Sequence, residues 1–441
     1  MASIKNLIAI DIILSHTGVK DTLKGVQDSF NSAMSVISDA SAKADSGFTR
    51  TADNLIKTGG VISSTGGILT TFITGPLVGL GTMAVNASRE FESAFAGVKK
   101  TVDETANTSF KDLSDGIRQM ATEIPAAVTE IAAVAEAAGQ LGISADDVLE
   151  FTEVMVNLGV STNMSAEQAA TALARIANVM GNTADEYERM GSTIVYLGNN
   201  FATTETEIAN MSTRISTAAS SLNMTTAEVM GLAAGLTSIG ITAEAGGTAI
   251  SKFLSSMAFA SDVGNKNLKE LEQQTGLTGR EMELMSSNNS KGFKELASEL
   301  GMTTTEMNKV IKAGKDLNTM SEISGMEAEE FAKIVREEPV EAFLMFIDGL
   351  ANAQDAMMEN GEASESLISL LNELGVSEVR MTALLKGSAS AHDLIREAIY
   401  GANGAWEDNT ALTKEAAARY ETFDSQIQLM KNSWKDVMIA I

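Results

Sequence analysis

Residues 420–441 carry apolar side chains at an alternating spacing of three and four, which is the pattern of a coiled-coil seam. This spacing keeps one apolar stripe on the side of a helix that faces another helix, so it predicts a rod of several helices. The bulky, mixed seam favours three strands or more, and we expect the chain to form a homo-oligomer through it. The predicted seam residues are Tyr420, Phe423, Ile427, Met430, Trp434, Val437 and Ile441.

A second stretch with the same spacing lies near the other end of the chain, and its later half is alanine-rich. Its seam consists of Val19, Leu23, Val26, Phe30, Ala33, Ile37, Ala40 and Ala44. Before it, the segment Leu7–Leu14 alternates aliphatic with smaller or polar residues, which predicts one short N-terminal strand. Two coiled-coil-like ends around a helical middle are more typical of an assembly component than of an enzyme.

The composition predicts an all-α fold, with a multi-helix globular core flanked by the two coiled-coil-like helices. Only 3 prolines and 5% aromatic residues accompany abundant alanine and methionine, as is typical of helical proteins. Short helices are expected to begin at a Ser or Thr that is followed three residues later by an acid or amide. These predicted N-caps are Ser144, Ser165, Thr225 and Thr303, and the predicted left-handed helix ends before them are Gly142, Asn223 and Gly301.

Shifts in composition divide the chain into six predicted segments. They are 1–57, a strand plus the heptad-like helix; 58–88, an uncharged Gly/Ser/Thr-rich apolar segment; 89–264, a helical core; 265–325, a polar helical insertion; 326–404, a helical continuation of the core; and 405–441, the start of the coiled-coil rod. The glycines of Gly401–Gly404 predict a hinge before the rod.

The chain carries a formal net charge of -26, and this charge is unevenly distributed. Residues 1–100 hold 9 Lys/Arg against 8 Asp/Glu, whereas residues 101–441 hold 23 against 50. Such an acidic surface repels phosphate, which counts against specific DNA or RNA binding. The absence of cysteine excludes disulfides, thiolate metal ligands and a cysteine nucleophile, and it fits assembly in a reducing cytoplasm.

Residues 58–88 contain no charged side chain, but their seven glycines, Pro76 and many Ser and Thr keep the mean hydropathy modest for a spanning helix. Two interpretations stay open: a buried Gly/Ser/Thr-rich linker, or a segment that enters a bilayer on release. The candidate membrane residues are Phe72, Ile73, Pro76, Leu77, Val78 and Leu80.

The sequence predicts no catalytic, cofactor or metal site. The two histidines, His16 and His392, stand far apart, and neither has a zinc-ligand motif around it. Glu136 and Glu167 are nominal candidates for a cell-wall lyase, although each fits a helix-face or capping role. We therefore expect a protein that is not an enzyme.

The stretch from Phe72 to Val102, FITGPLVGLGTMAVNASREFESAFAGVKKTV, resembles the core region of phage tail tape measure proteins. In that family a Thr-x-Pro-Leu element precedes a Gly/Ala-rich run, and a helix then carries Phe-Glu-x-x-[Met/Phe] and ends near Val-[Lys/Arg]-[Lys/Arg]. Here these elements are Thr74–Leu77, Phe91–Phe95 and Val98–Lys100. The likeness continues to about residue 260 through Ile124-Pro125, Ala135–Ile143, Ser165–Ala170 and Thr225–Val229, and Tyr420–Lys431 is similar to the family's exit from its core.

The resemblance implies a structural protein that lies extended in the lumen of a phage or tailocin tail and sets tube length. Because a helix advances about 1.5 Å per residue, the length of a rod encodes a distance. The resemblance also implies assembly in the host cytoplasm, residence in the virion tail lumen and release ahead of the DNA. The implied partners are the tail tube protein, tail assembly chaperones, the tail-tip or baseplate hub and, in some members, the host membrane.

Two other functions stay open from the sequence. A membrane-active helical protein would insert through residues 58–88, and a cell-wall lyase would act through a single glutamate. A length ruler would need roughly several hundred further residues of rod, since each adds only about 1.5 Å. We therefore expect the chain to be a fragment of a longer ruler, an unusually short ruler, or a relict.

Overall fold

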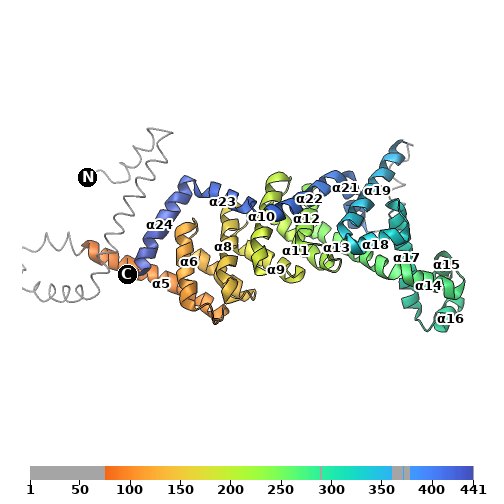
Figure 1. The fold of residues 1–441 in the computed structure, drawn as a ribbon, viewed down its shortest axis with the longest axis horizontal. Coiled ribbons are helices and arrows are strands. Elements are labelled where there is room, and N and C mark those ends of the chain that lie inside the picture. The colour runs from red at the N-terminus through yellow and green to blue at the C-terminus, as the bar shows by residue number, and fades with distance from the viewer. Residues whose placement is uncertain (1–74, 289–290, 360–370, 372–377, 441) are drawn as a thin grey trace, which may run out of the picture. The chain divides into compact units, whose positions relative to one another are not determined.

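A computed structural model describes residues 75–288, 291–359, 371 and 378–440. Every regular element among these residues is a helix, so the predicted all-α fold is confirmed (Figure 1). The predicted strand over Leu7–Leu14 and the heptad-like stretch from Val19 to Ala44 lie outside the described residues. Contacts divide the chain into two compact units, each with its own packing.

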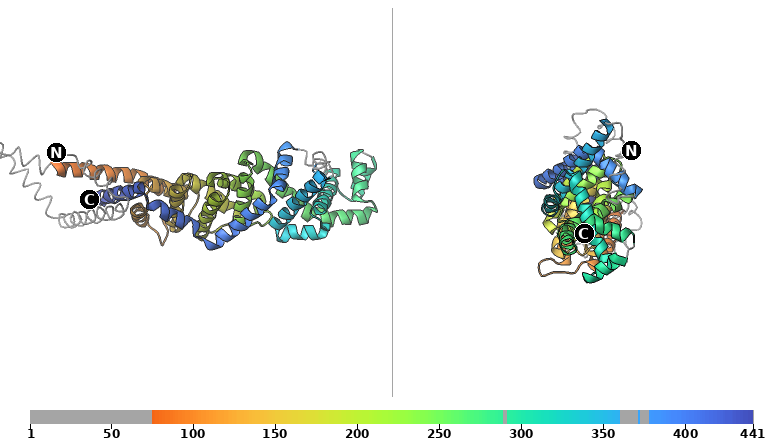
Figure 2. Two further views of the ribbon diagram at one scale, coloured as in Figure 1. Left: turned by 90° about the horizontal axis from the view of Figure 1, so that it is seen from above. Right: turned by 90° about the vertical axis from the view of Figure 1, so that its right-hand side faces the viewer.

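Among the described residues, unit 1 contains 75–140, 144–149 and 420–440. Its helices are α5 (Gly75–Thr101), α6 (Phe110–Glu123), α7 (Val128–Gln140), the start of α8 (Ala145–Ser161) and α24 (Phe423–Ala440). Within this unit α5 packs along α7, and α24 lies beside α5 and α6 (Figure 2).

α5 contributes buried aromatic residues to unit 1, and it approaches the backbone of α7 closely at one glycine. Phe91 and Phe95 of α5 are buried, and their rings stack with centroids 5.7 Å apart. A Cβ on Gly139 of α7 would lie 2.8 Å from the Thr101 carbonyl oxygen, so glycine is what lets the two helices come this close. α6 begins with a capping box in which the Ser109 hydroxyl accepts from the Asp112 backbone N–H.

Unit 2 contains residues 141–143 and 150–419. After the remainder of α8, its elements are α9 (Ala166–Met180), η2 (Ala184–Glu186), α10 (Tyr187–Asn200), α11 (Glu205–Ser220), α12 (Thr226–Ser238), α13 (Ala243–Phe259), η3 (Ala260–Gly264), α14 (Asn265–Thr275), α15 (Gly279–Ser287), α16 (Lys291–Glu299), α17 (Thr304–Ile323), α18 (Ala328–Glu337), α19 (Pro339–Glu359), α21 (Val379–Ser390), α22 (His392–Asp408) and α23 (Ala411–Tyr420).

The core of unit 2 consists of two rows of helices. α9, α11 and α13 are neighbours in one row, and α10, α12 and α22 are neighbours in the other, so successive helices from α9 to α13 alternate between rows. α22 lies directly on α12. A Cβ on Gly231 would be 2.6 Å from the Cα of Ile399, and a Cβ on Gly235 would be 2.9 Å from the Cα of Ile395. The two glycines of α12 therefore permit contact between helix backbones.

The predicted helix starts and ends are largely confirmed. Ser165, Thr225 and Thr303 each form a complete capping box with the residue three positions later. At Ser144 the hydroxyl donates to the Asp147 carboxylate at 2.8 Å. The predicted left-handed residues Gly142, Asn223 and Gly301 have φ values of 85°, 60° and 67°. Short polar motifs thus located these turns without any tertiary information.

Residues 265–325 hold the helices α14 to α17, which share a hydrophobic cluster of their own. Its buried members are Leu268, Leu271, Met282, Phe293, Ala297, Met307, Val310 and Ile311. The short π-helix η3 joins α13 to α14 and packs on α17, where a Cβ on Gly264 would lie 2.5 Å from the Ala313 carbonyl oxygen. The boundaries of the six predicted segments stay predictions.

The hinge predicted at Gly401–Gly404 is wrong, because α22 continues through both glycines. Gly401 faces the Tyr196 ring, and a Cβ there would lie 3.0 Å from Cε1 of that ring. This glycine therefore makes room for a neighbouring side chain and does not mark a break in the helix.

Candidate functional site

The C-terminal helix α24 contacts α6 through a buried side-chain amide. Asn432 is 4% exposed, and its Nδ2 donates to the carbonyl oxygens of Ala121 and Ala126, each at 2.7 Å. The Ala121 carbonyl is one of the last four of α6, which lack a partner within their own helix. Gln428 donates to the Asn432 Oδ1 at 2.9 Å, so the amide is satisfied at both ends. Asn432 therefore caps the end of α6.

Two ion pairs flank this amide. Arg118 Nε of α6 donates to Asp436 Oδ1 at 2.7 Å, and its Nη2 donates to the Asp436 carbonyl oxygen at 3.3 Å. Lys435 Nζ donates to Glu90 Oε2 of α5 at 2.6 Å. This hydrogen bond holds the pKa of Glu90 below its ordinary value of 4.5. The polar contacts thus tie α24 to both neighbouring helices.

A small apolar contact lies at the end of α24. Met438 is buried against Ala84 and Ala87 of α5, and Trp434 and Ile439 pack around it. We call Asn432, Trp434, Lys435, Asp436, Met438 and Ile439 the docking face of α24. Sequence reasoning did not predict this face. A polar residue outside the heptad seam gives the same sequence pattern whether its side chain is buried or exposed to solvent.

The predicted seam overlaps the docking face at Trp434, and its other residues lie elsewhere on the same helix. Ile427, Met430, Trp434 and Val437 are half-buried, and Phe423 is 43% exposed. Tyr420 ends α23, and Ile441 lies outside the described residues. Use of the seam for oligomerisation stays a prediction.

The candidate membrane residues are only partly described. Pro76, Leu77, Val78 and Leu80 belong to the first turns of α5, whereas Phe72 and Ile73 lie outside the described residues. Among the helices that the structure describes, none combines the length and the apolar character needed to span a bilayer.

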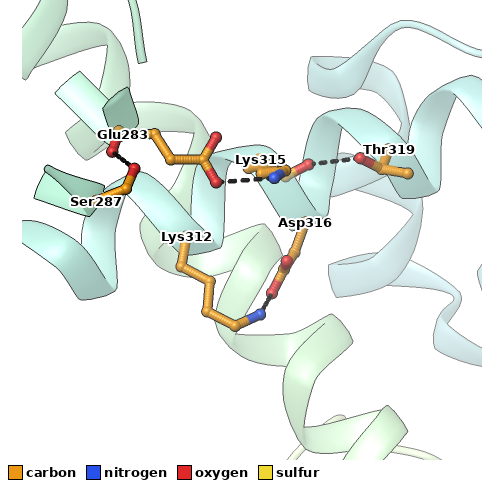
Figure 3. A network of polar contacts seen from close by, with 6 residues as sticks. All are labelled: Glu283, Ser287, Lys312, Lys315, Asp316 and Thr319. Carbon is orange, nitrogen blue, oxygen red and sulfur yellow. Dashed lines mark hydrogen bonds and ion pairs between the residues drawn. The ribbon is translucent and has the colours of Figure 1, made fainter. Parts of the chain in front are cut away.

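A second candidate site is a cleft of about 740 Å³ between α14, α15 and α17 of unit 2. Leu268, Leu284 and Ile311 contribute apolar surface to it. Lys315 Nζ of α17 donates to Glu283 Oε1 of α15 at 2.8 Å (Figure 3). Glu272 Oε1 accepts from the Gly279 backbone N–H at 2.8 Å. Both carboxylates therefore hold the helices of the cleft together.

One acid beside this cleft is buried. Asp316 is 5% exposed, and its carboxylate accepts from Lys312 Nζ at 2.5 Å (Figure 3). Burial raises the pKa of the Asp316 carboxyl above its ordinary value, while the ammonium of Lys312 opposes the rise. The Lys312–Asp316 pair therefore places an ionisable carboxyl where α17 packs on its neighbouring helices.

The nominal catalytic residues have structural surroundings. The Glu136 carboxylate accepts from Gln140 Nε2 at 3.2 Å, and Glu167 is exposed in the first turn of α9. His392 Nδ1 lies 3.0 Å from the Ala389 carbonyl oxygen, and His16 lies outside the described residues. Within the described part of the chain, no three metal-ligating side chains come together.

Comparison with known proteins identifies one family. Residues 114–325 match the model of a family described as phage-related minor tail protein, and this stretch includes α7 to α17 in full. No curated protein and no solved structure matched the chain. The family match therefore supports a phage tail protein family for this chain.

Proposed function

We propose that the chain is a tape measure protein, a structural component of the tail lumen that sets the length of a phage or tailocin tail tube. The observation that carries the proposal is the match of residues 114–325 to the phage-related minor tail protein family. The resemblance of Phe72–Val102 to the tape measure core agrees with it and lies outside the matched residues.

The heptad pattern gives the proposal its physical basis. A helical rod advances about 1.5 Å per residue, so the number of residues in the rod sets the tube length at which growth stops. α24 supplies helical residues at the predicted start of that rod. In this proposal the seam joins copies of the chain, three or more, along the tail axis.

The proposed partners follow from the same role. The rod lies inside the tail tube protein, one end meets the tail-tip or baseplate hub, and assembly chaperones bind the chain in the host cytoplasm. Its net charge of -26 favours basic or neutral partner surfaces over nucleic acid. The rod then leaves the tube ahead of the DNA.

In-frame changes of rod length test the proposal. Adding 49 residues as seven heptads at the C-terminal end of the seam is expected to lengthen the tail by about 70 Å, measured by electron microscopy of the particles. The matched control inserts the same number of residues between α17 and α18, outside the rod. Tails of unchanged length with the longer rod would contradict the proposal.

A further inference from the structure

We propose that α24 is a strap on unit 1, which opens and closes as one step while α5, α6 and α7 stay folded. The proposal adds a conformational step to the proposed function, and it rests on that function only in taking α24 as the start of the rod. While the strap is closed, unit 1 holds a residue of the predicted seam. The rod can therefore use its full seam only after the strap has opened.

The contacts that join α5, α6 and α7 include several that do not involve α24. The Thr101 hydroxyl of α5 donates to the Glu136 carbonyl oxygen of α7 at 3.1 Å. Gly139 of α7 lies directly against Thr101 and Val102 of α5. α6 also packs on α7. These contacts do not have to break when α24 leaves, so unit 1 keeps a core of three helices.

α24 is attached to this core by few buried groups. Asn432 and Met438 are its fully buried residues among those described. In the ion pair with α5, the side chains of Lys435 and Glu90 are 28% and 61% exposed, so water competes for the contact. Regions with few buried apolar contacts open at a lower free energy than the core of a domain. α24 is therefore the part of unit 1 that is expected to open first.

The connection to unit 2 keeps the first turn of α24 intact when the helix leaves unit 1. Glu421 and Thr422 lie between α23 and α24. The Thr422 hydroxyl accepts from the Ser425 backbone N–H at 3.4 Å, and the Thr422 carbonyl oxygen accepts from the Gln426 backbone N–H at 3.0 Å. Because these bonds are local, they cap the start of α24 whether or not it contacts unit 1.

Trp434 links the strap to the predicted seam. It packs with Met438 on Ala84 and Ala87 of α5. In the heptad pattern it takes the same core position as Ile427, and such positions face the partner helix in a coiled coil. One indole cannot pack on α5 and in a coiled-coil seam at the same time. Closing of the strap and coiling at Trp434 therefore exclude each other.

Native-state hydrogen exchange of the 441-residue chain tests the strap, measured by mass spectrometry at several urea concentrations below the unfolding transition. Exchange through a small opening depends little on urea, whereas exchange through unfolding of the whole unit depends on it steeply. We expect the amides of α24 to be protected at least about tenfold less than those of α7, and to respond more weakly to urea.

A reversible covalent lock supplies the matched control, because the chain contains no cysteine. In the chain with Ala87→Cys and Met438→Cys, oxidation fixes α24 on α5, since both positions lie in one apolar cluster. A non-reducing gel verifies the lock, and Ala84→Cys with Met438→Cys is the alternative pair. Oxidation should slow exchange in α24 by at least about tenfold and leave α7 within about twofold, and reduction should restore the faster exchange.

Equal protection and equal urea dependence of α24 and α7 would overturn the inference, because α24 would then unfold only with the rest of unit 1. A lock that slows α5, α6 and α7 as much as α24 would also overturn it, since the opening would then involve the whole unit. Both results leave the tail-length test of the proposed function as it stands. If that test fails while α24 still opens alone, the strap stands and only its link to the rod is lost.

Discussion

Helices α22 and α24 follow one another closely in sequence, yet their own units hold them by opposite means. α22 buries Ile395, Ala398, Ile399, Ala402 and Ala405. α24 fully buries only Asn432 and Met438 among its described residues, and it combines polar contacts with a small apolar cluster around Met438. α22 packs its apolar side chains against the glycines of α12, so it belongs to the core of unit 2. A helix held by one amide, two ion pairs and a small apolar cluster is positioned specifically but buries less apolar surface.

The two helices therefore differ in the kind of side chain that each uses to contact its own unit. A core helix such as α22 buries most of its apolar residues in its own unit. α24 docks largely through polar residues, and fewer of its apolar residues are fully buried than in α22. The docking bonds are also directional, so they fix which turn of α24 meets the end of α6.

The largest effect is expected from Gly231→Ala, which disrupts the close contact between the backbones of α12 and α22. The added methyl group would lie 2.6 Å from the Ile399 Cα and 2.8 Å from the Ala398 carbonyl oxygen, so backbone would have to move. We expect unit 2 to lose about 3 kcal/mol of unfolding free energy, measured by denaturant titration.

Gly404→Ala in α22 is the matched control for this substitution. Nothing lies within 4 Å of the Cβ that it adds, so better helix propensity should stabilise unit 2 by up to about 1 kcal/mol. Equal destabilisation by both substitutions would mean that helix flexibility, and not the close approach of α12 and α22, explains the role of Gly231.

The next largest effect is expected from Asn432→Ala, which removes the hydrogen bonds between α24 and the end of α6. It leaves the Ala121 and Ala126 carbonyl oxygens without their donor, at a cost of about 2 kcal/mol to the docking of α24. Hydrogen exchange should show faster exchange across α24 and the last turn of α6, with unit 2 unchanged.

Ser433→Ala is the control, because the Ser433 hydroxyl donates to the Leu429 carbonyl oxygen of its own helix. It should leave exchange in α24 as it is. Unchanged protection of α24 in Asn432→Ala would show that Met438 and its apolar neighbours suffice to hold the helix.

Local patterns predicted much of the fold because local groups satisfy them. The hydroxyl of Thr225 and the carboxylate of Glu228 form a capping box within four residues, and Asn223 tolerates a left-handed φ by itself. The heptad spacing likewise placed a helix over most of 420–441. None of these inferences needed knowledge of a distant contact.

The missed features depend on partners far away in the sequence. Asn432 contacts carbonyl groups more than 300 residues earlier, and only the folded chain brings them together. Gly401 suggested a break because glycine favours turns, whereas the Tyr196 ring explains it. Asp316 had the pattern of a solvated i,i+4 pair with Lys312, and its burial depends on how α17 packs.

Asp316→Asn tests a third kind of contact, a buried ionisable side chain, beside the apolar contact of α22 and the polar contacts of α24. The folded pKa of Asp316 lies above the ordinary 3.8, so folding is favoured when the group is protonated. The unfolding free energy should therefore fall as pH rises from 3.8 through the raised value. Asp316→Asn should remove this dependence and stabilise α14–α17 by on the order of 1 kcal/mol at neutral pH, measured by denaturant titration across pH.

Lys312→Met is the opposite test of the same pair. It removes the ammonium that favours the charged carboxylate, so the pKa of Asp316 should rise further and the helices should be less stable at neutral pH. If Asp316→Asn destabilises these helices instead, the ion pair outweighs the cost of burying the acid.

The smallest effect is expected from Lys435→Met, because the Glu90–Lys435 pair is solvent-exposed. The folded pKa of Glu90 is below 4.5, so the pair supports docking above pH 4.5 and loses that contribution as pH falls through the lowered value. Hydrogen exchange of α24 should therefore accelerate less on acidification in Lys435→Met than in the unmodified chain, whereas Asn432→Ala should keep the full acid response. If Lys435→Met leaves the acid response of α24 unchanged, the Glu90–Lys435 pair does not explain it, and the prediction is contradicted.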